Sequence, residues 1–265
     1  MTRPGVPLLS LVVLVGALLT ACGGSASGDD RAADRPAEPR RPAAASAPAT
    51  TDPAAGPSDG AGEAVYVAVG ASETVGVGAD RPTEEAWPRV LHDTALRETR
   101  YVNVGVSGST VSEALSEQLP QALAADPDVV TVWLAVNDIT HLVPVEAYEQ
   151  QLRTLVHALR QDGRTEVLVA NVPPVQDLPA YRACLPGAAN ADDCSLPVVP
   201  SEAQVVAVVD DFNAAVDRVV RAEGAVLVDV SDSRDLARLT SADGFHPSTR
   251  GHRLVARSFA HALEG

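Results

Sequence analysis

The sequence predicts an α/β domain in which helices cover both faces of a parallel β-sheet. Short, almost entirely apolar runs rich in valine alternate with longer segments whose apolar residues recur at helical spacing. In these runs, apolar and polar residues do not alternate. A continuous apolar run is typical of a strand buried on both faces. A glycine or a small polar residue stands at the end of each run. Alternation of strands and helices along a chain favours parallel pairing of the strands.

Five of the apolar runs are predicted strands. They are enriched in β-branched and aromatic residues, which suit a pleated, buried surface. The predicted strands cover residues 64–70, 101–106, 129–136, 165–171 and 225–230. Ligands of parallel sheets bind beyond the carboxyl ends of the strands, so the residues directly after each strand are the candidates for chemistry.

The segments between the strands have the apolar spacing of amphipathic helices. Thr110 and Glu113 form a capping box at the start of one helix. Gly163 and Gly224 end two others, because glycine readily adopts the conformation that closes a helix. The predicted helices cover residues 84–96, 110–119, 145–159, 205–219 and 250–263.

Residues 1–21 are predicted to be an export signal. Arg3 supplies a positive charge ahead of the apolar run Leu8–Leu19, and this run is too short to span a membrane comfortably. The run ends in Leu19-Thr20-Ala21-Cys22, which resembles the lipobox of bacterial lipoproteins. That resemblance implies that Cys22 is lipidated and becomes the first residue of the mature protein. The alternative is an ordinary secretory peptide with a chance cysteine.

Residues 22–63 are predicted to form a flexible tether that begins at the lipidated cysteine. They consist mainly of alanine, proline, glycine, serine, aspartate and arginine, with almost no large apolar side chain. Such a segment cannot bury enough surface to offset the entropy lost on ordering. Residues 64–265 are long enough for one domain with a substantial core. We therefore expect a domain anchored by lipid on the extracytoplasmic face of the cell membrane.

The charge and the cysteines limit the possible partners. The net charge is −15 and the acidic excess lies mostly in the domain, so nucleic acid is not an expected partner. Cys184 and Cys194 share a loop rich in proline, alanine, asparagine and aspartate. In an exported protein such a pair favours a disulfide, the alternative being two free thiols. Too few other ligands stand nearby for a metal site, and we expect no cofactor.

Three strand ends carry residues suited to nucleophilic catalysis. Gly70-Ala71-Ser72 ends the first strand, where glycine permits a sharp turn and a helix N-terminus favours an anion. Ser107–Thr110 follows the second strand, and the backbone N–H of Gly108 can approach a ligand closely. Asn137 follows the third strand and offers a neutral donor, whereas Asp138 is interpreted as structural. Taken singly, these segments are also compatible with ordinary turns and caps.

The last loop supplies a candidate base. Asp243 and His246 are separated by Gly244 and Phe245, so a turn can bring the carboxylate to one imidazole nitrogen. The other nitrogen then stays free to accept the proton of a serine. The carboxylate fixes the tautomer of the ring and stabilises the imidazolium that forms. Together with the strand ends, this loop predicts an enzyme that works through a serine nucleophile.

In this order, the four segments resemble the motif blocks of the SGNH hydrolases, also called the GDSL esterase family. The matching blocks are residues 70–72, 103–110, 136–138 and 243–246. The resemblance spans the whole domain and implies Ser72 as nucleophile, His246 as base and Asp243 as its partner. It also implies an oxyanion hole made by Gly108, Asn137 and the backbone N–H of Ser72. The implied fold is a flavodoxin-like three-layer α/β/α sandwich with a five-stranded parallel sheet, and the implied reaction is ester hydrolysis.

Two positions depart from the family pattern. Ala71 replaces the aspartate of Gly-Asp-Ser, and Ala135 replaces the glycine of Gly-x-Asn-Asp. Neither change removes a reacting atom, so activity is expected to survive. The methyl group of Ala135 is expected to crowd the pocket and to bias substrate size. His141, about one turn after Asn137, is a further candidate for the pocket wall.

The favoured function is a membrane-anchored, extracytoplasmic serine esterase that forms an acyl-enzyme and acts as a monomer. Its substrates would be lipid or short-chain acyl esters, or the acetyl groups of cell-wall or other polysaccharides. Aromatic residues make up 3% of the chain, and Trp87 and Trp133 are expected in the core, which leaves few platforms for sugars. A non-catalytic ligand-binding lipoprotein is the alternative from another class, and the intact Ser72, Asp243 and His246 argue against it.

Overall fold

The computed structural model describes residues 63–265, apart from residues 195, 197 and 232–233. The predicted export signal, the lipidation site Cys22 and the tether through residue 62 lie outside the described residues. Within the part of the chain that the structure describes, no helix combines the length and the apolar character needed to cross a bilayer.

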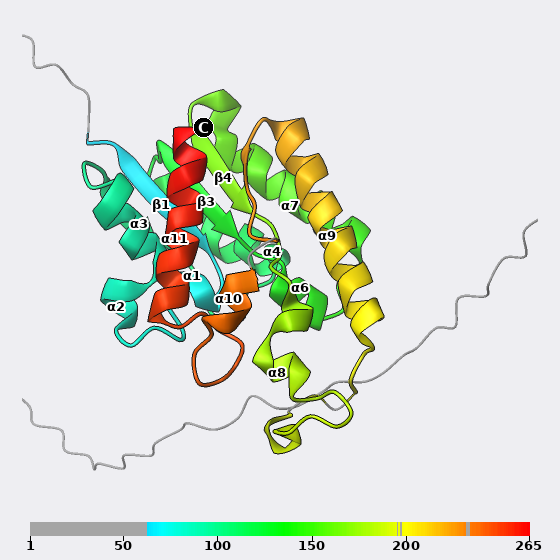
Figure 1. The fold of residues 1–265 in the computed structure, drawn as a ribbon. Coiled ribbons are helices and arrows are strands. Elements are labelled where there is room, and N and C mark those ends of the chain that lie inside the picture. Colours follow the sequence, from blue (N-terminus) through cyan, green and yellow to red (C-terminus); the bar gives the residue numbers. More distant parts are fainter. Residues whose placement is uncertain (1–62, 195, 197, 232–233) are drawn as a thin grey trace, which may run out of the picture. The chain divides into compact units, whose positions relative to one another are not determined.

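Five parallel strands form a single sheet in the order β2-β1-β3-β4-β5 (Figure 1). The strands are β1 (Val65–Gly70), β2 (Arg100–Asn103), β3 (Val129–Trp133), β4 (Glu166–Ala170) and β5 (Val226–Val228). This confirms the predicted α/β fold with a five-stranded parallel sheet. The strand order changes direction at β1, whose two neighbours are β2 and β3. Ligands of open parallel sheets bind at such a switch point, where the loops after adjacent strands diverge.

Strand β1 is buried along its whole length because both faces of the sheet are covered. Successive side chains of a strand point to opposite faces. Val65, Val67 and Val69 accordingly pack into one hydrophobic cluster. Tyr66 and Ala68 pack into a second cluster on the other face. The sheet and its two layers of helices therefore make the three-layer sandwich that was predicted.

The first face of the sheet is covered by a layer of helices that includes α9, the longest helix among the described residues. This layer contains α4 (Val111–Glu113), the π-helix η1 (Ala114–Gln118), α5 (Leu119–Ala124), α7 (Val145–Arg160) and α9 (Glu202–Glu223). Tyr148 of α7 packs on Phe212 of α9 with ring centroids 4.6 Å apart. Thr110 forms the predicted capping box with Glu113 at the start of α4.

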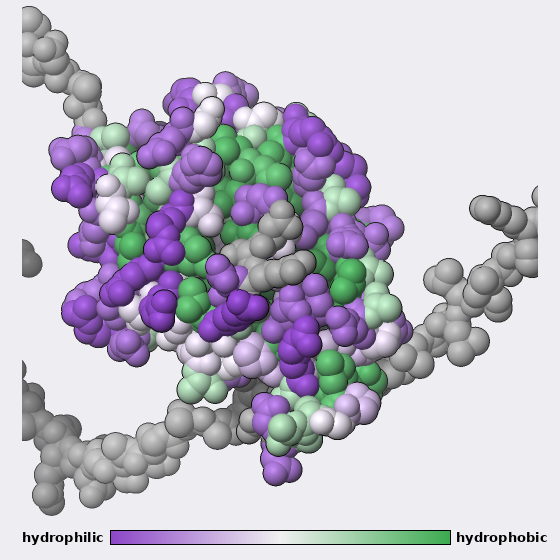
Figure 2. All heavy atoms as spheres, in the orientation of Figure 1, coloured by the Kyte–Doolittle hydropathy of each residue, from purple (hydrophilic) through white to green (hydrophobic). Residues whose placement is uncertain are grey.

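The opposite face is covered by α3 (Trp87–Ala95) and α11 (Thr249–Glu264), which lie in front of the sheet in Figure 1. Trp87 stacks on Phe259 of α11 with ring centroids 4.3 Å apart, and its ring edge meets Trp133. Both tryptophans are buried, as predicted. Figure 2 shows this face, where hydrophilic residues cover the outward sides of the helices and hydrophobic residues lie between them.

Several boundaries differ from the prediction. The segment predicted as one helix from residue 84 is two, α2 (Pro82–Glu85) and α3, because Ala86 between them has the non-helical ψ of 140°. The strands predicted to end at residues 106 and 136 end at Asn103 and Trp133, and the residues that follow form loops and a helix. Short helices without a full apolar period were missed. They are α1 (Ser72–Val75), α6 (Val136–Thr140), α8 (Pro179–Arg182) and α10 (Arg234–Arg238).

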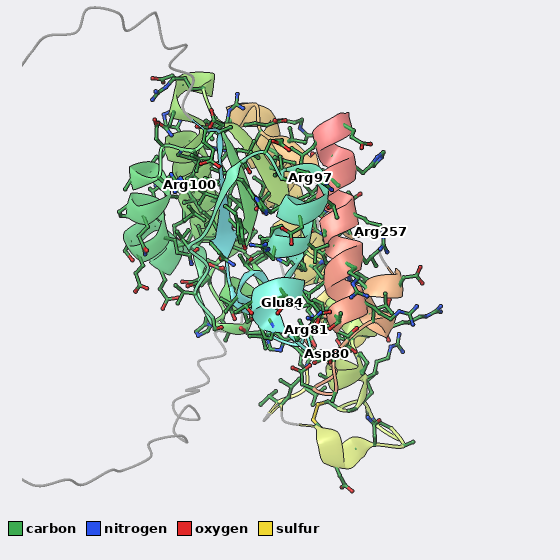
Figure 3. All side chains as sticks on the ribbon, turned by 90° about the vertical axis from the view of Figure 1, so that its left-hand side faces the viewer. Asp80, Arg81, Glu84, Arg97, Arg100 and Arg257 are labelled. Atoms are coloured by element: carbon green, nitrogen blue, oxygen red, sulfur yellow. A yellow bond between two sulfur atoms is a disulfide. The ribbon has the colours of Figure 1, made fainter. Side chains whose placement is uncertain are left out.

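Polar contacts hold α2 against the start of α11. Arg81 pairs with Glu84 and Glu85, and Figure 3 shows Arg81 and Glu84 close together at the start of α2. Arg253 of α11 reaches Glu85 at 3.2 Å. The backbone N–H of Asp80 donates to the hydroxyl of Thr249 at 2.9 Å. These contacts fix the segment after α1 to the first turn of α11.

The end of β1 is held by the fully buried side chain of Gln118, the last residue of the π-helix. Its Oε1 accepts the backbone N–H of Gly70 at 3.0 Å, and its Nε2 donates to the carbonyl of Gly70 at 3.0 Å. π-helical turns often occur at functional sites, where they redirect a side chain. Here the amide of Gln118 satisfies both backbone polar groups of Gly70, two residues before Ser72.

Replacing Gln118 by leucine is expected to lower the free energy of unfolding by about 1–3 kcal/mol, because the buried N–H of Gly70 loses its acceptor. Gln121→Leu is the matched control, since Gln121 is exposed on the next turn. Urea denaturation followed by circular dichroism would measure both variants. Equal stabilities for the two variants would contradict this role of Gln118.

Candidate active site

Ser72 is the first residue of α1 and follows directly on the end of β1. Gly70 allows the chain to turn tightly here, because a Cβ at this position would lie 2.0 Å from Oγ1 of Thr74. The helix closes after one turn at Gly76, whose φ is +101°. Backbone N–H groups in the first turn of a helix have no partner within that helix. The turn therefore presents both the Ser72 hydroxyl and its N–H at the carboxyl edge of the sheet.

The structure brings Ser72, His246 and Asp243 together from opposite ends of the domain. Nε2 of His246 lies 3.0 Å from Oγ of Ser72. Nδ1 of His246 lies 2.6 Å from Oδ2 of Asp243. An ionised carboxylate can only accept hydrogen bonds, so Nδ1 carries the ring proton and Nε2 is free to accept one from Ser72. This is the arrangement of a nucleophile, a base and a group that orients the base.

Asp243 is held as a carboxylate by several donors. Its Oδ1 accepts hydrogen bonds from the Ser241 hydroxyl at 2.7 Å and from the N–H groups of Phe245 and His246 at 2.9 and 3.0 Å. Partial burial by itself would raise the pKa of Asp243, but the hydrogen bond from the His246 ring and these donors lower the pKa to about 2. Asp243 is therefore ionised at any pH at which the domain would work.

The loop that carries Asp243 and His246 is closed on itself. Thr240 and Pro247 form an antiparallel bridge, and the N–H of Ser241 donates to the carbonyl of His246 at 2.8 Å. Gly244 has a φ of +67° and its carbonyl accepts the N–H of Ala180 at 3.1 Å. A Cβ on Gly244 would lie 2.9 Å from that nitrogen, so glycine is required for this close approach.

His252 supports the same loop from behind, a role that the sequence did not reveal. It is fully buried on α11, where its Nδ1 accepts the N–H of Trp87 at 3.2 Å and its Nε2 donates to the carbonyl of Val77 at 3.1 Å. Gly78, which follows Val77, passes close to Pro247. A Cβ added to Gly78 would lie 2.3 Å from the Pro247 carbonyl oxygen. Burial lowers the pKa of His252, which favours the neutral ring that these two hydrogen bonds need.

Of the two further predicted oxyanion donors, Gly108 lies on the loop after β2 and Asn137 lies in α6, and hydrogen bonds tie the loop to the end of β1 and α6 to the loop. The N–H of Val106 donates to the Gly70 carbonyl at 3.1 Å. Gly108 has a φ of +84°, and a Cβ there would face open space. Nδ2 of Asn137 donates to the carbonyl of Ser109 at 3.0 Å. The side-chain nitrogen of Asn137 carries two hydrogens. One of them bonds to Ser109, and the predicted oxyanion role requires the other.

The neighbouring residues have structural roles. Both carboxylate oxygens of Asp138 lie 3.2 Å from the N–H of Val111, which ties α6 to the start of α4. Burial raises the pKa of Asp138 to about 6. Ala71 and Ala135 are buried in the hydrophobic core. His141 is exposed and is not part of the pocket wall, and its Nδ1 lies 2.7 Å from the Asn137 carbonyl oxygen.

A small pocket of about 30 Å³ lies next to Ser72 and His246, whose sequence neighbours line it. Its walls come from the residue after Ser72, the end of β3, the loop after β4, α10 and both neighbours of His246. The lining residues are Glu73, Trp133, Val136, Pro173, Val175, Leu178, Leu236, Thr240, Phe245 and Pro247. The pocket is mainly apolar, and Glu73 is the charged member of the described wall.

A disulfide joins Cys184 and Cys194 in the loop between α8 and α9. The same segment contacts the site loop, because Ala180 of α8 donates to Gly244. Tyr181 fixes the other side of the segment by donating its hydroxyl to the carbonyl of Pro200 at 2.9 Å. Across the described residues, no group of three or more histidine, cysteine, aspartate or glutamate side chains could hold a metal ion.

Comparison with known proteins agrees with this geometry. The model of the GDSL-like Lipase/Acylhydrolase family matches residues 68–254, which is most of the chain and runs from β1 into α11. The chain belongs to this family. The match confirms the family predicted from the four motif blocks.

The individual proteins that the chain resembles are distant from it in sequence. An arylesterase from Vibrio mimicus is 28% identical over 107 residues, which are 38% of this chain and 53% of the relative. The match thus spans about half the length of that curated relative. A lipase/acylhydrolase from Enterococcus faecalis has a TM-score of 0.58 at 18% identity, covering 76% of this chain and 96% of its own. Esterase EstA from Pseudoalteromonas sp. has a TM-score of 0.55 at 17% identity, and the match covers 76% of this chain and 96% of EstA. These two structures share the fold.

His252 makes the stability of this GDSL-like domain depend on pH. The pKa of His252 is lower in the folded protein than in the unfolded chain. The stabilisation that the neutral ring provides is therefore complete above the ordinary histidine pKa of about 6.5, and it is lost as the pH falls through the folded-state pKa. We expect His252→Gln to lower the free energy of unfolding by about 1–3 kcal/mol at pH 8 and by less at pH 5.

Urea denaturation between pH 5 and 8 would measure this difference. His261→Gln is the matched control, because His261 is exposed on the same helix. A loss of stability in His252→Gln that is the same at pH 5 and pH 8 would show that the ring proton is not the cause.

Proposed function

We propose that this chain is a serine esterase in which Ser72, His246 and Asp243 form the catalytic triad. The observation that carries the proposal is the continuous hydrogen-bonded chain from Ser72 Oγ through His246 to Asp243, at 3.0 and 2.6 Å. Membership of the GDSL-like family supports the reaction type. A ligand-binding protein on the same fold would gain nothing from this chain of contacts.

In the first step, His246 Nε2 takes the hydroxyl proton of Ser72 while Oγ attacks the ester carbonyl carbon. Asp243 stabilises the imidazolium that forms, and its low pKa means that it stays ionised. The negative charge of the tetrahedral intermediate is held by the N–H groups of Ser72 and Gly108 and by the amide of Asn137. Loss of one such donor typically costs about 10²–10³ in kcat.

In the second step, the intermediate collapses and the C–O bond to the alcohol breaks. His246 returns the proton to the departing alcohol oxygen, which leaves an acyl group on Ser72. A water molecule then gives a proton to His246 and attacks the acyl carbon, and the acid is released as the proton returns to Ser72. Every proton in this cycle moves through one ring nitrogen, and the chemistry needs no metal or organic group.

The proposed substrates are small carboxylic esters. The pocket beside the triad is narrow, at about 30 Å³, and its wall is mainly apolar. Pockets of this size hold a group comparable with one or two water molecules. This supports short ester substrates over long-chain lipids.

A fluorophosphonate probe is expected to add its mass to Ser72 and to abolish hydrolysis of p-nitrophenyl acetate. The activated hydroxyl attacks phosphorus as it would attack an ester carbonyl, and the loss of Oγ in Ser72→Ala should prevent both labelling and turnover. Intact-protein mass spectrometry and a colorimetric assay would measure the two effects. Absence of labelling together with absence of turnover of any aryl ester would overturn the proposal.

We further propose that the domain acts outside the cytoplasm while anchored to the membrane through a lipid on Cys22. The support is the lipobox-like Leu19–Cys22 and the apolar run before it. An extracytoplasmic location also suits the disulfide between Cys184 and Cys194, because disulfides persist in oxidising compartments.

Replacing Cys22 by serine removes the acceptor of the lipid and is expected to release the protein from membranes. Fractionation of cells followed by immunoblotting would measure the distribution of the wild type and of Cys22→Ser. Cys184→Ser is a useful control, because it removes a cysteine without touching the proposed anchor. Membrane association that persists in Cys22→Ser would refute lipidation as the means of attachment.

A further inference from the structure

One polar residue at the site is not used by the mechanism. Glu73 follows Ser72, so that Gly70-Ala71-Ser72-Glu73 stands where the name of the family has Gly-Asp-Ser-Leu. The Oε2 of Glu73 lies 3.3 Å from Oγ of Ser72. An acid therefore replaces an apolar side chain directly beside the nucleophile.

The surroundings of Glu73 suit a positive charge. It is partly buried in the wall of the pocket, and the other described lining residues are uncharged. Two of them, Trp133 and Phe245, are aromatic, and aromatic rings attract cations that approach their faces. A carboxylate next to aromatic rings in a small apolar pocket attracts an alkylated ammonium group and repels an anion.

The position of the pocket indicates which part of the substrate it contacts. Phe245 and Pro247, the two neighbours of His246, both line it. In the proposed mechanism, His246 gives its proton to the departing alcohol oxygen. The alcohol must therefore lie on the same side of Ser72 as the imidazole ring of His246. Of the predicted oxyanion donors, Gly108 has no residue of its loop in the described wall, whereas Ser72 and Asn137 each have one neighbour there, Glu73 and Val136. We assign the pocket to the alcohol part of the ester because residues on both sides of His246 line it.

We infer that Glu73 sets the charge preference of the enzyme, and that its preferred substrates are short-chain esters of small alcohols that carry an ammonium group. The apolar end of the pocket admits a methyl group, while the charge stays beside the partly exposed carboxylate. A cation bound there also competes with the Ser72 hydroxyl for Glu73, which leaves that hydroxyl to His246. This inference rests on the proposed esterase function.

The test compares two esters of the same shape, acetylcholine and 3,3-dimethylbutyl acetate, which differ in the positive charge. The full chain is expected to hydrolyse acetylcholine with a kcat/KM about 5- to 10-fold higher than that of the neutral ester. In Glu73→Gln and Glu73→Leu the ratio of the two kcat/KM values should fall towards one. Glu166→Gln is the matched control, because it removes the same charge from the exposed amino end of β4 and should keep the wild-type ratio.

The outcomes separate this inference from the proposed function. If p-nitrophenyl acetate is hydrolysed but the wild type shows no preference for acetylcholine, the inference about Glu73 is wrong and the esterase proposal stands. A preference that survives unchanged in Glu73→Gln also overturns it. If no ester is hydrolysed by the wild type, the proposed function itself fails.

Discussion

The two hydrogen bonds between Gln118 and the backbone of Gly70 fix the point at which the chain leaves the sheet just before Ser72. β1 is buried on both faces, so the polar groups at its end cannot rely on water. Gln118 satisfies them from a π-helical turn, and Val106 adds a third hydrogen bond from the loop after β2. Because Val106 and Gly108 share one loop, the position of Ser72 is coupled to that loop. The geometry of the site therefore follows from the need to satisfy the buried polar groups at the end of β1.

The fold and the contacts among Ser72, His246 and Asp243 could be predicted because they depend on patterns that are local in the sequence. Apolar runs identified all five strands, and the Thr110–Glu113 box identified the start of α4. The Asp243–His246 spacing is also local, since an aspartate three residues ahead can cap the turn and still reach the ring. Ser72 became identifiable through its place at the end of the first strand and through the family pattern.

The remaining features depend on contacts between distant segments. His252 has the spacing of any residue on an amphipathic helix, and its importance arises from Val77 and Trp87, which are far away in sequence. The strands were predicted too long because valine and alanine continue beyond the last pairing residue, whereas hydrogen bonds to neighbouring strands decide where a strand ends. Ala135 is buried in the hydrophobic core, a placement that the sequence alone does not give.

The contact between Ser72 and His246 joins residues 174 positions apart. During synthesis, the growing chain therefore contains Ser72 long before it contains His246. The hydrogen bond between the Ser72 hydroxyl and the His246 ring can form only after the last loop has been added. The contact that the proposed mechanism needs is thus absent from any chain that stops short of this loop.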